Sequence, residues 1–410
     1  MATVVLLGTL DTKGDEYAYI RALLNGHGVE TILIDAGVLG EPRAVADVTR
    51  EEVAKAAGAD VRALADAGDR GAAVETMARG AAKIVTGLHA EGHLDGILAL
   101  GGSGGTAVAT EAMRALPVGV PKLMVSTMAS GDTRPYVGAT DVTMTYSVVD
   151  ISGINAVSAR ILTNAAAAMA GMATADPPTV EGGKPLVGAT MFGVTTPCVT
   201  AARERLEELG YEVLVFHATG TGGQSMEALM RSGFITASLD ATTTELADDL
   251  VGGVLSAGPD RLEAAGELGI PQVVSLGALD MVNFGPLETV PAEFRDRLLY
   301  KHNQTVTLMR TTAEESAELG RRIGRKLSSA TGPVTLFIPL RGVSLIDVEG
   351  QVFFDPEADQ ALFDALRDTL DSGVDVRELD TDVNDPAFAH AMVDTLHEHY
   401  QAWAAGEVRA

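Results

Sequence analysis

Short apolar runs alternate with amphipathic segments along nearly the whole chain. Residues 3–8 (TVVLLG) are continuously apolar, as buried strands are, and residues 29–37 (VETILIDAG) repeat the pattern. Between these runs, and again over residues 71–90, apolar side chains recur every three or four positions, which is the period of an amphipathic helix. Strands that alternate with helices in this way are typical of βαβ units. The pattern therefore predicts an α/β fold with mainly parallel sheets.

One segment interrupts the alternation. Residues 176–185 (DPPTVEGGKP) contain three prolines and two glycines, a composition typical of a linker. On each side of it the chain begins with a strand, a polar turn, a helix and a second strand. A chain of 410 residues is also long enough for two domains of ordinary size. We therefore expect two Rossmann-like, doubly wound domains, at residues 1–176 and 186–410.

The charge of the chain narrows the class of ligand. The sequence has 30 Lys and Arg against 56 Asp and Glu, a formal net charge of −26. Nucleic acids and anionic membranes attract clustered basic side chains, so we expect neither as a partner. The apolar runs are shorter than the roughly 18 residues of a membrane helix, and the first residues lack the basic start of a signal peptide. We expect a cytoplasmic protein with a small-molecule ligand.

The chain has a single cysteine, Cys198. One cysteine excludes an intrachain disulfide and a cysteine-based zinc cage. Cys198 stands near the start of a predicted helix, where the pKa of a thiol can fall. No nucleophile signature surrounds it, so a passive role is the expectation and a chemical role stays open.

Ligands of open parallel sheets bind beyond the carboxyl ends of the strands, so the residues that follow each strand carry the candidate chemistry. After the first strand come Asp11, Thr12 and Lys13, which could contact phosphate oxygens, a magnesium ion or a hydroxyl. Asp35 follows the second strand, where an acidic residue often accepts a hydrogen bond from a ribose hydroxyl. Both stretches also have the composition of ordinary turns.

A glycine-rich loop follows a third predicted strand. Residues 101–106 (GGSGGT) lead into an alanine-rich helix. Glycines let the backbone approach a ligand closely, and the N–H groups at a helix N-terminus attract anions. The loop lacks the lysine of a P-loop, but Lys13 is expected at the same sheet edge and could supply the positive charge. We predict that Lys13 and the loop converge on one anion. The expected loop ligands are Gly102, Ser103, Gly104, Gly105 and Thr106.

Polar residues follow the predicted strands of the second half as well. Residues 216–225 (FHATGTGGQS) form another glycine-containing turn before a helix, which is suited to an anion. We expect His217, His302, Arg310 and Arg341 to form a polar cluster in a cleft, although His217 could equally be a structural histidine. Their spacing matches no metal-ligand motif, so no metal site is predicted. The full set of candidates for this second site is His217, Gly222, Gly223, Ser225, Asp280, His302, Arg310, Arg341 and Ser344.

Several stretches together resemble one protein family. The sequences LLGTLDTKGDE, ILALGGSGGT, GATMFGVTTPCV, FHATGTGGQSME and PLRGVSLID look like motifs of an uncharacterised, ATP-binding family of bacteria and fungi. The same family forms the N-terminal region of the tomato mosaic virus resistance protein of plants, and the similarity extends over essentially the whole chain. The resemblance implies two Rossmann-like subdomains, ATP bound in the first, and a homodimer. It also implies that the nucleotide contacts the turn at residues 11–13 and the loop at residues 102–105.

These observations lead to one principal expectation and two alternatives. We expect an ATP-binding protein, with or without Mg²⁺, that performs ATP-dependent chemistry on a small anionic substrate in a cleft between the domains. Alternatively, the protein is a non-catalytic ATP sensor, or an isomerase or lyase that uses the glycine loop for a substrate phosphate. The dinucleotide fingerprint is missing from the turn after the first strand, which disfavours a dehydrogenase.

Overall fold

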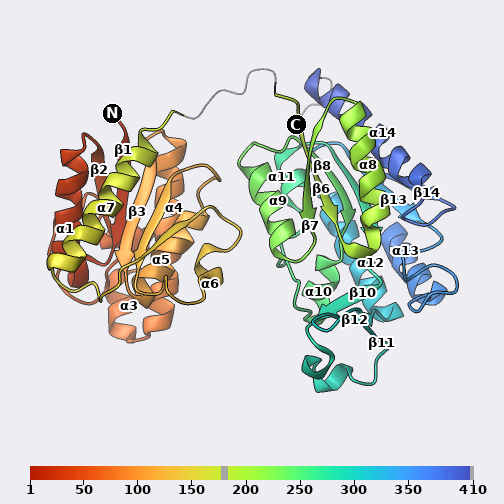
Figure 1. Ribbon diagram of the computed structural model, residues 1–410, viewed down its shortest axis with the longest axis horizontal. Helices are drawn as coiled ribbons and strands as arrows, with labels where there is room; N and C mark the ends of the chain where they lie inside the picture. Colours follow the sequence, from red (N-terminus) through yellow and green to blue (C-terminus); the bar gives the residue numbers. More distant parts are fainter. Residues whose placement is uncertain (177–182, 407–410) are drawn as a thin grey trace. The chain divides into compact units, whose positions relative to one another are not determined.

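The computed structural model describes residues 1–176 and 183–406 (Figure 1). The chain divides into two compact units, Met1–Thr179 and Val180–Ala410, and each is described here by itself. Most of the predicted linker, residues 177–182, lies outside the described residues. Within the described residues, no helix is long and apolar enough to cross a membrane.

The first unit is built on a five-stranded sheet in the order β2-β1-β3-β4-β5. Every neighbouring pair of strands is parallel. Successive side chains of β1 enter different cores, because a strand presents alternate residues to opposite faces of its sheet. Val4 and Leu6 pack in one core, and Val5 and Leu7 in the other. The strands are β1 (Thr3–Gly8), β2 (Glu30–Asp35), β3 (Gly96–Gly101), β4 (Lys122–Ser126) and β5 (Thr143–Tyr146).

Helices cover both faces of this sheet. The face with Val4 and Leu6 packs against α1 (Leu10–Gly26) and α7 (Ala156–Ala173). The other face packs against the helices of the β2–β3 crossover and against the helix after β3. These are α2 (Arg50–Ala56), α3 (Val61–Ala67), α4 (Arg70–Ala90) and α5 (Ser103–Arg114), and the short α6 (Arg134–Val137) lies in the loop after β4.

The second unit repeats this plan with one more strand. Its six-stranded sheet has the order β14-β13-β9-β8-β6-β7, again with parallel neighbours. The order β7-β6-β8 corresponds to β2-β1-β3 of the first unit, so the predicted α/β fold with two mainly parallel, Rossmann-like sheets is confirmed. The strands are β6 (Leu186–Met191), β7 (Glu212–His217), β8 (Ala237–Thr242), β9 (Gln272–Gly277), β13 (Val334–Pro339) and β14 (Asp375–Leu379).

Two helices pack on one face of the second sheet, namely α8 (Thr196–Glu208) and α14 (Pro386–Ala404). Another core joins the sheet to α10, α12 and α13. The helices of the second unit not yet bounded are α9 (Thr221–Arg231), α10 (Glu245–Val251), α11 (Ala264–Leu268), α12 (Ala313–Ser328) and α13 (Pro356–Thr369).

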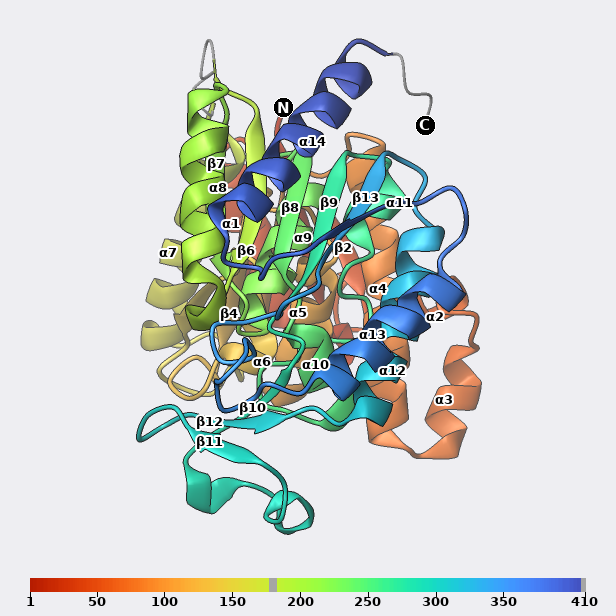
Figure 2. The same ribbon diagram turned by 90° about the vertical axis from the view of Figure 1, so that its right-hand side faces the viewer.

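The second unit also contains a small antiparallel sheet, which the sequence pattern did not predict. Its order is β10-β12-β11, and Figure 2 shows it at one end of the unit, close to α10. The apolar stretch TVTLMR at residues 305–310 has the pattern of one more strand of a parallel sheet. A parallel pair needs a crossover of a dozen or more residues that is usually helical, and the chain between these strands forms only short 3₁₀ turns. The strands are β10 (Met281–Phe284), β11 (Leu299–Lys301) and β12 (Thr307–Arg310).

Candidate functional site

A pocket of about 490 Å³ lies at the carboxyl ends of the strands of the first sheet. Segments that follow β1, β2 and β3 line it, together with the first two turns of α4. The chain leaves β1 into α1 on one face of the sheet and leaves β3 into α5 on the other face. The strand order therefore reverses between β1 and β3, and such a switch point is where doubly wound folds bind ligands. The lining includes Thr9, Asp11, Thr12, Lys13 and Gly101–Gly105.

The glycine loop presents unsatisfied donors to this pocket. Gly102 is the N-cap of α5, and Ser103, Gly104 and Gly105 form its first turn. Within the described residues, the backbone N–H groups of these three residues have no hydrogen-bond acceptor. A Cβ atom on Gly101 would lie 3.1 Å from the Cα atom of Gly105, so the glycine lets the strand and the helix approach closely. The loop thus has the features of an anion-binding helix N-terminus.

Thr106, which was expected to contact the ligand, supports the loop from inside the protein. It is fully buried and does not line the pocket. Its hydroxyl donates to the carbonyl of Gly102 over 2.7 Å and lies 2.7 Å from the hydroxyl of Ser126. Thr106 therefore holds the loop in shape and does not face a ligand.

The turn after β1 is separated from the rest of α1 by a kink. Lys13 has the non-helical dihedral angles φ −130° and ψ 19°, so residues 10–12 form a turn of their own at the edge of the pocket. The Thr9 and Thr12 hydroxyl oxygens lie 2.8 Å apart. Lys13 lines the pocket, and its ammonium group donates to the carbonyl of Ile151, which is not part of the lining. Lys13 and the glycine loop thus line the same pocket, and their convergence on one anion stays a prediction.

The two acidic residues of this region, Asp11 and Asp35, form hydrogen bonds with other groups of the protein. Asp11 accepts hydrogen bonds from the N–H groups of Leu39 and Gly40, both over 3.2 Å. Asp35 is buried and is not in the pocket lining. It accepts from the N–H group of Leu10 over 3.0 Å and from Arg50 Nε over 2.8 Å. Asp35 thus connects the ends of β2, α1 and α2, a positioning role in place of the expected contact with a ribose.

Arg70 lines the same pocket and was missed by the sequence interpretation. It is the first residue of α4, which Asp69 caps by accepting from the N–H group of Ala72 over 3.0 Å. Gly68, with φ +66°, makes the turn that leads into this cap. The sequence could have indicated Arg70, because the helix of a β–α–β crossover runs antiparallel to its strands. Such a helix therefore begins at the carboxyl edge of the sheet.

Tyr17 holds the switch point together. The pairing between β1 and β3 ends at Leu7 and Ala99, and the Tyr17 hydroxyl lies just beyond that point. It donates to the carbonyl of Leu7 and accepts from the N–H group of Leu100 over 2.9 Å. A Cβ atom on Gly8 would stand 2.1 Å from this hydroxyl, so Gly8 makes the room for it. Burial raises the pKa of Tyr17, and the phenol therefore stays protonated.

Replacing Tyr17 with phenylalanine is expected to destabilise the first unit by about 1–3 kcal/mol, the cost of leaving buried polar groups without a partner. The ring remains packed, and only the bridge between Leu7 and Leu100 is lost. Hydrogen exchange of the Leu100 amide should accelerate. Tyr19→Phe is the control, because the Tyr19 hydroxyl makes no hydrogen bond within the described residues. Equal exchange rates in both variants would contradict the bridging role.

The glycine turn after β7 already holds an anion from its own chain. Glu245 Oε1 accepts from the N–H groups of Gly220 and Gly223 over 2.7 Å and 3.0 Å. A Cβ atom on Gly223 would lie 2.2 Å from Glu245 Oε2, so this position requires a glycine. The expected anion-binding turn exists, but the carboxylate of Glu245 occupies it instead of a substrate.

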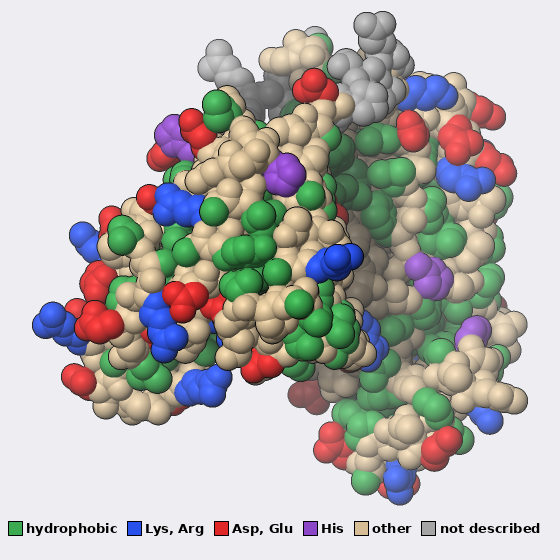
Figure 3. Space-filling model, turned by 60° about the vertical axis from the view of Figure 1, so that its left-hand side comes forward, with side chains coloured by type: hydrophobic (Ala, Val, Ile, Leu, Met, Phe, Trp, Pro, Cys, Tyr) green, Lys and Arg blue, Asp and Glu red, His purple; other side chains and the backbone are tan. Residues whose placement is uncertain are grey.

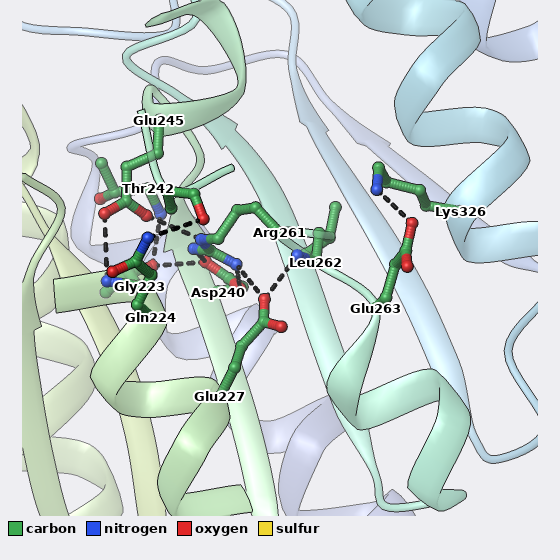
Figure 4. Close-up of polar contacts among 12 residues, drawn as sticks. Gly223, Gln224, Glu227, Asp240, Thr242, Glu245, Arg261, Leu262, Glu263 and Lys326 are labelled. Atoms are coloured by element: carbon green, nitrogen blue, oxygen red, sulfur yellow. Dashed lines mark hydrogen bonds and ion pairs between the residues drawn. The ribbon is translucent and has the colours of Figure 1, made fainter. Parts of the chain in front are cut away.

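A buried network surrounds Glu245 at the switch point of the second sheet (Figure 4). Arg261 donates from Nε to Glu245 over 2.7 Å and from both terminal nitrogens to Asp240 over 2.6 Å. Glu227 lies 3.4 Å from the same guanidinium. All four side chains are buried. The side chains of this network therefore fill the position in the second unit that corresponds to the pocket of the first unit.

Three further candidates gather in a second buried cluster. Arg310 donates to Asp347 over 3.1 Å and to Asp359 over 2.7 Å, and the Ser344 hydroxyl donates to Asp280 over 2.8 Å. Burial raises the pKa of Asp280 to about 6. Burial and the neighbouring Asp280 and Asp359 raise the pKa of Asp347 to about 9.

The remaining candidates of the second half lie apart, so the expected cluster of four polar side chains does not form. His217 is exposed and stacks on Phe192 with ring centroids 5.4 Å apart. Arg341 forms an exposed ion pair with Asp380 at the end of β13, four strands away from β7. His302 is exposed next to β11.

The structure also shows the surroundings of Gly222, Ser225 and Cys198. Gly222 packs against the backbone of His217, because a Cβ atom on it would lie 1.8 Å from that carbonyl oxygen. Ser225 is half-buried in α9. Burial, followed by the charge of Asp382, raises the pKa of the Cys198 thiol to about 12, which keeps it from acting as a thiolate at neutral pH.

Comparisons with known proteins divide the chain in the same two parts. Residues 2–178 match the N-terminal domain, and residues 184–400 the C-terminal domain, of the uncharacterised protein family UPF0261. The chain belongs to the UPF0261 family. A UPF0261 protein of Clostridium tetani is 57% identical over 394 residues, which cover 96% of this chain and 98% of that protein. The family inferred from the sequence motifs is therefore confirmed.

The plant relative is also present among the similar proteins. The ToMV resistance protein Tm-1(GCR237) of Solanum lycopersicum is 42% identical over 417 residues, which cover 96% of this UPF0261 chain and 55% of the plant protein. Among solved structures, MurG of Acinetobacter baumannii covers 100% of this chain and 99% of its own, at 12% identity and a TM-score of 0.21. A likeness this weak carries no argument about function.

Proposed function

We propose that the first unit of this UPF0261 protein binds ATP in the pocket between β1 and β3. The observation that carries the proposal is the lining of the pocket. Three free backbone N–H groups, at Ser103, Gly104 and Gly105, and the cationic Lys13 line one space at a topological switch point. Such N–H groups and the helix dipole favour phosphate. The family resemblance read from the motifs supports the choice of ATP among phosphate ligands.

The pocket has the size and the mixed character that a nucleotide needs. Ligand pockets of roughly 300–1,000 Å³ commonly combine apolar walls with a few polar groups, and this one encloses about 490 Å³. The phosphates would lie at the first turn of α5, with Lys13 and the Thr12 hydroxyl as further contacts. The base would pack against the apolar part of the lining, which comprises Val38, Leu39, Leu64, Val74, Met77 and Val108.

The proposal also covers the reaction, the metal ion, the oligomeric state and the cellular location. We expect ATP-dependent chemistry on a small anionic substrate, and Mg²⁺ would accompany the triphosphate, with Asp11 and Asp69 as the carboxylates in the lining. We propose a cytoplasmic homodimer, as the family resemblance implies. Steady release of ADP from a pure preparation would count for an enzyme and against a sensor that only binds ATP.

Replacing Gly104 with glutamate is expected to weaken ATP binding at least about 100-fold. A carboxylate in the first turn suits the helix dipole and should not harm folding. The Cβ atom also has room, since its nearest neighbour, Arg70, is 3.5 Å away. The new charge would, however, stand in the phosphate space and repel the ligand. Isothermal titration with ATP, with and without Mg²⁺, measures the loss.

Gly87→Glu is the matched control for this experiment. Gly87 lies exposed on α4 with open space around it, so the same charge is added to the same unit outside the pocket. Its affinity for ATP should equal that of the unchanged protein. Absence of binding heat from the unchanged protein at millimolar ATP would refute the proposal.

A further inference from the structure

The pocket contains a second cation, Arg70, that the proposed function does not require. Lys13 and Arg70 are the basic residues among the described residues that line it. Arg70 is exposed, and its Nη2 atom lies 3.5 Å from the point where a Cβ atom on Gly104 would stand. Gly104 carries the middle one of the three free N–H groups of α5. The guanidinium therefore stands directly beside the anion-binding turn.

The carboxylates of the pocket do not neutralise these cations. Asp11 accepts from the backbone N–H groups of Leu39 and Gly40, and Asp69 accepts from that of Ala72. Within the described residues, neither aspartate forms an ion pair with Lys13 or Arg70. Elsewhere in this acidic chain, arginines such as Arg50 and Arg261 are paired with carboxylates. The positive charges of the pocket are therefore not neutralised by a carboxylate, although the Lys13 ammonium group donates a hydrogen bond to the carbonyl of Ile151.

The three groups of donors come from three separate elements. Lys13 belongs to the turn after β1, the free N–H groups begin α5, and Arg70 begins α4. One phosphate can be bound by the N–H groups of a helix N-terminus alone. Two further cations from two other elements match a longer anion that carries more charge. A guanidinium also offers a planar fork that binds two phosphate oxygens together, which an ammonium group cannot do.

We propose that Arg70 binds phosphate and that the pocket is a site for a chain of two or more phosphates. The inference adds a phosphate-binding residue to the proposed ATP site. It rests on the proposed function only if the phosphate chain is part of a nucleotide. Arg70 then selects nucleoside di- and triphosphates over monophosphates. Lys13 and the turn of α5 bind phosphate whether or not Arg70 is present.

Isothermal titration of the full chain with ATP, AMP and inorganic tripolyphosphate tests this inference. We expect the unchanged protein to bind ATP and tripolyphosphate more tightly than AMP. Arg70→Ala should weaken ATP and tripolyphosphate about 10- to 100-fold, the range for a hydrogen bond to a charged group, and should change AMP little. Arg70→Lys should lie between, because it keeps the charge and loses the fork. Arg62→Ala, at an exposed position on α3 outside the lining, is the control.

The possible outcomes separate this inference from the proposed function. If Arg70→Ala binds ATP as tightly as the unchanged protein, Arg70 has no such role while ATP binding stands. If AMP binds as tightly as ATP, the site takes one phosphate and the inference is overturned. If tripolyphosphate binds in an Arg70-dependent way but ATP does not, the phosphate-chain site stands and the nucleotide proposal fails. If neither tripolyphosphate nor ATP binds, both fail.

Discussion

Replacing Arg261 with methionine is expected to lower the free energy of unfolding of the second unit by about 3–5 kcal/mol, the usual cost of breaking a buried ion pair. The guanidinium donates to Glu245 and twice to Asp240, with Glu227 as a third carboxylate beside it. A methionine fills the space but leaves these carboxylates buried without a cation. They must then take up protons or draw in water, and either change opposes folding.

Urea-induced unfolding of the full chain can measure this loss through tryptophan fluorescence. The single tryptophan, Trp403, lies in α14 and packs against the second unit, so its emission reports on that unit. Arg341→Met is the matched control. Arg341 pairs with Asp380 at the surface, where the two side chains are 65% and 72% exposed, so only a small loss is expected. Similar midpoints for the two variants would show that the buried network contributes no more than a surface pair. Arg261→Lys should fall between them, since it keeps the charge without the fork of donors.

The stability of the second unit is also expected to decrease as the pH rises from about 7 to about 9. Burial, together with Asp280 and Asp359, raises the pKa of Asp347 to about 9, and burial raises the pKa of Asp248 to about 7. In the folded unit these groups hold protons that the unfolded chain has already released, so unfolding releases protons. Their contribution to stability is complete below the unfolded pKa near 4 and is lost as the pH rises through the folded pKa. Each proton released corresponds to a slope of about 1.4 kcal/mol per pH unit.

Few other groups change the stability between pH 7 and pH 9, apart from Cys198, whose thiol pKa burial raises to about 12 and which therefore adds a loss in the same direction above about pH 8. Carboxylates with a lowered pKa, such as Glu315, are ionised in both states above about pH 5, and His399, whose pKa burial lowers, is neutral in both states above about pH 7. Asp347→Asn should flatten the slope, because the amide keeps the shape of the side chain without titrating. Asp380→Asn, at an exposed position, should leave the slope unchanged. A stability that is constant from pH 7 to pH 9 in the unchanged protein would contradict the assignment.

The candidate site in the first unit was largely predictable from the sequence because it depends on topology. Apolar runs mark the strands, and parallel strands end at a common edge, so the turn with Lys13 and the loop with Gly104 must approach each other however far apart they are in the chain. The same reasoning could have found Arg70, whose helix begins at that edge. It could not have shown that Asp35 is covered by Arg50, because that contact depends on how α2 packs.

The second unit shows where the sequence pattern was insufficient. A turn that reads GTGG before a helix has the same local features as the loop of the first unit, yet Glu245 fills it. Glu245 comes from the segment after β8, and its cation, Arg261, from a loop further along the chain. Local composition cannot indicate that a carboxylate from another element lies within hydrogen-bond distance.

The sequence by itself determined the α/β class, the division into two similar units and the strand ends at which ligands would meet the chain. These properties follow from the period of apolar residues and from the geometry of parallel strands, both of which are local or topological. Only the tertiary structure decided which of the two glycine turns is open to a ligand. Whether a helix N-terminus faces solvent or a carboxylate of its own chain depends on contacts such as that of Glu245 with Gly220, which form only when distant elements pack together.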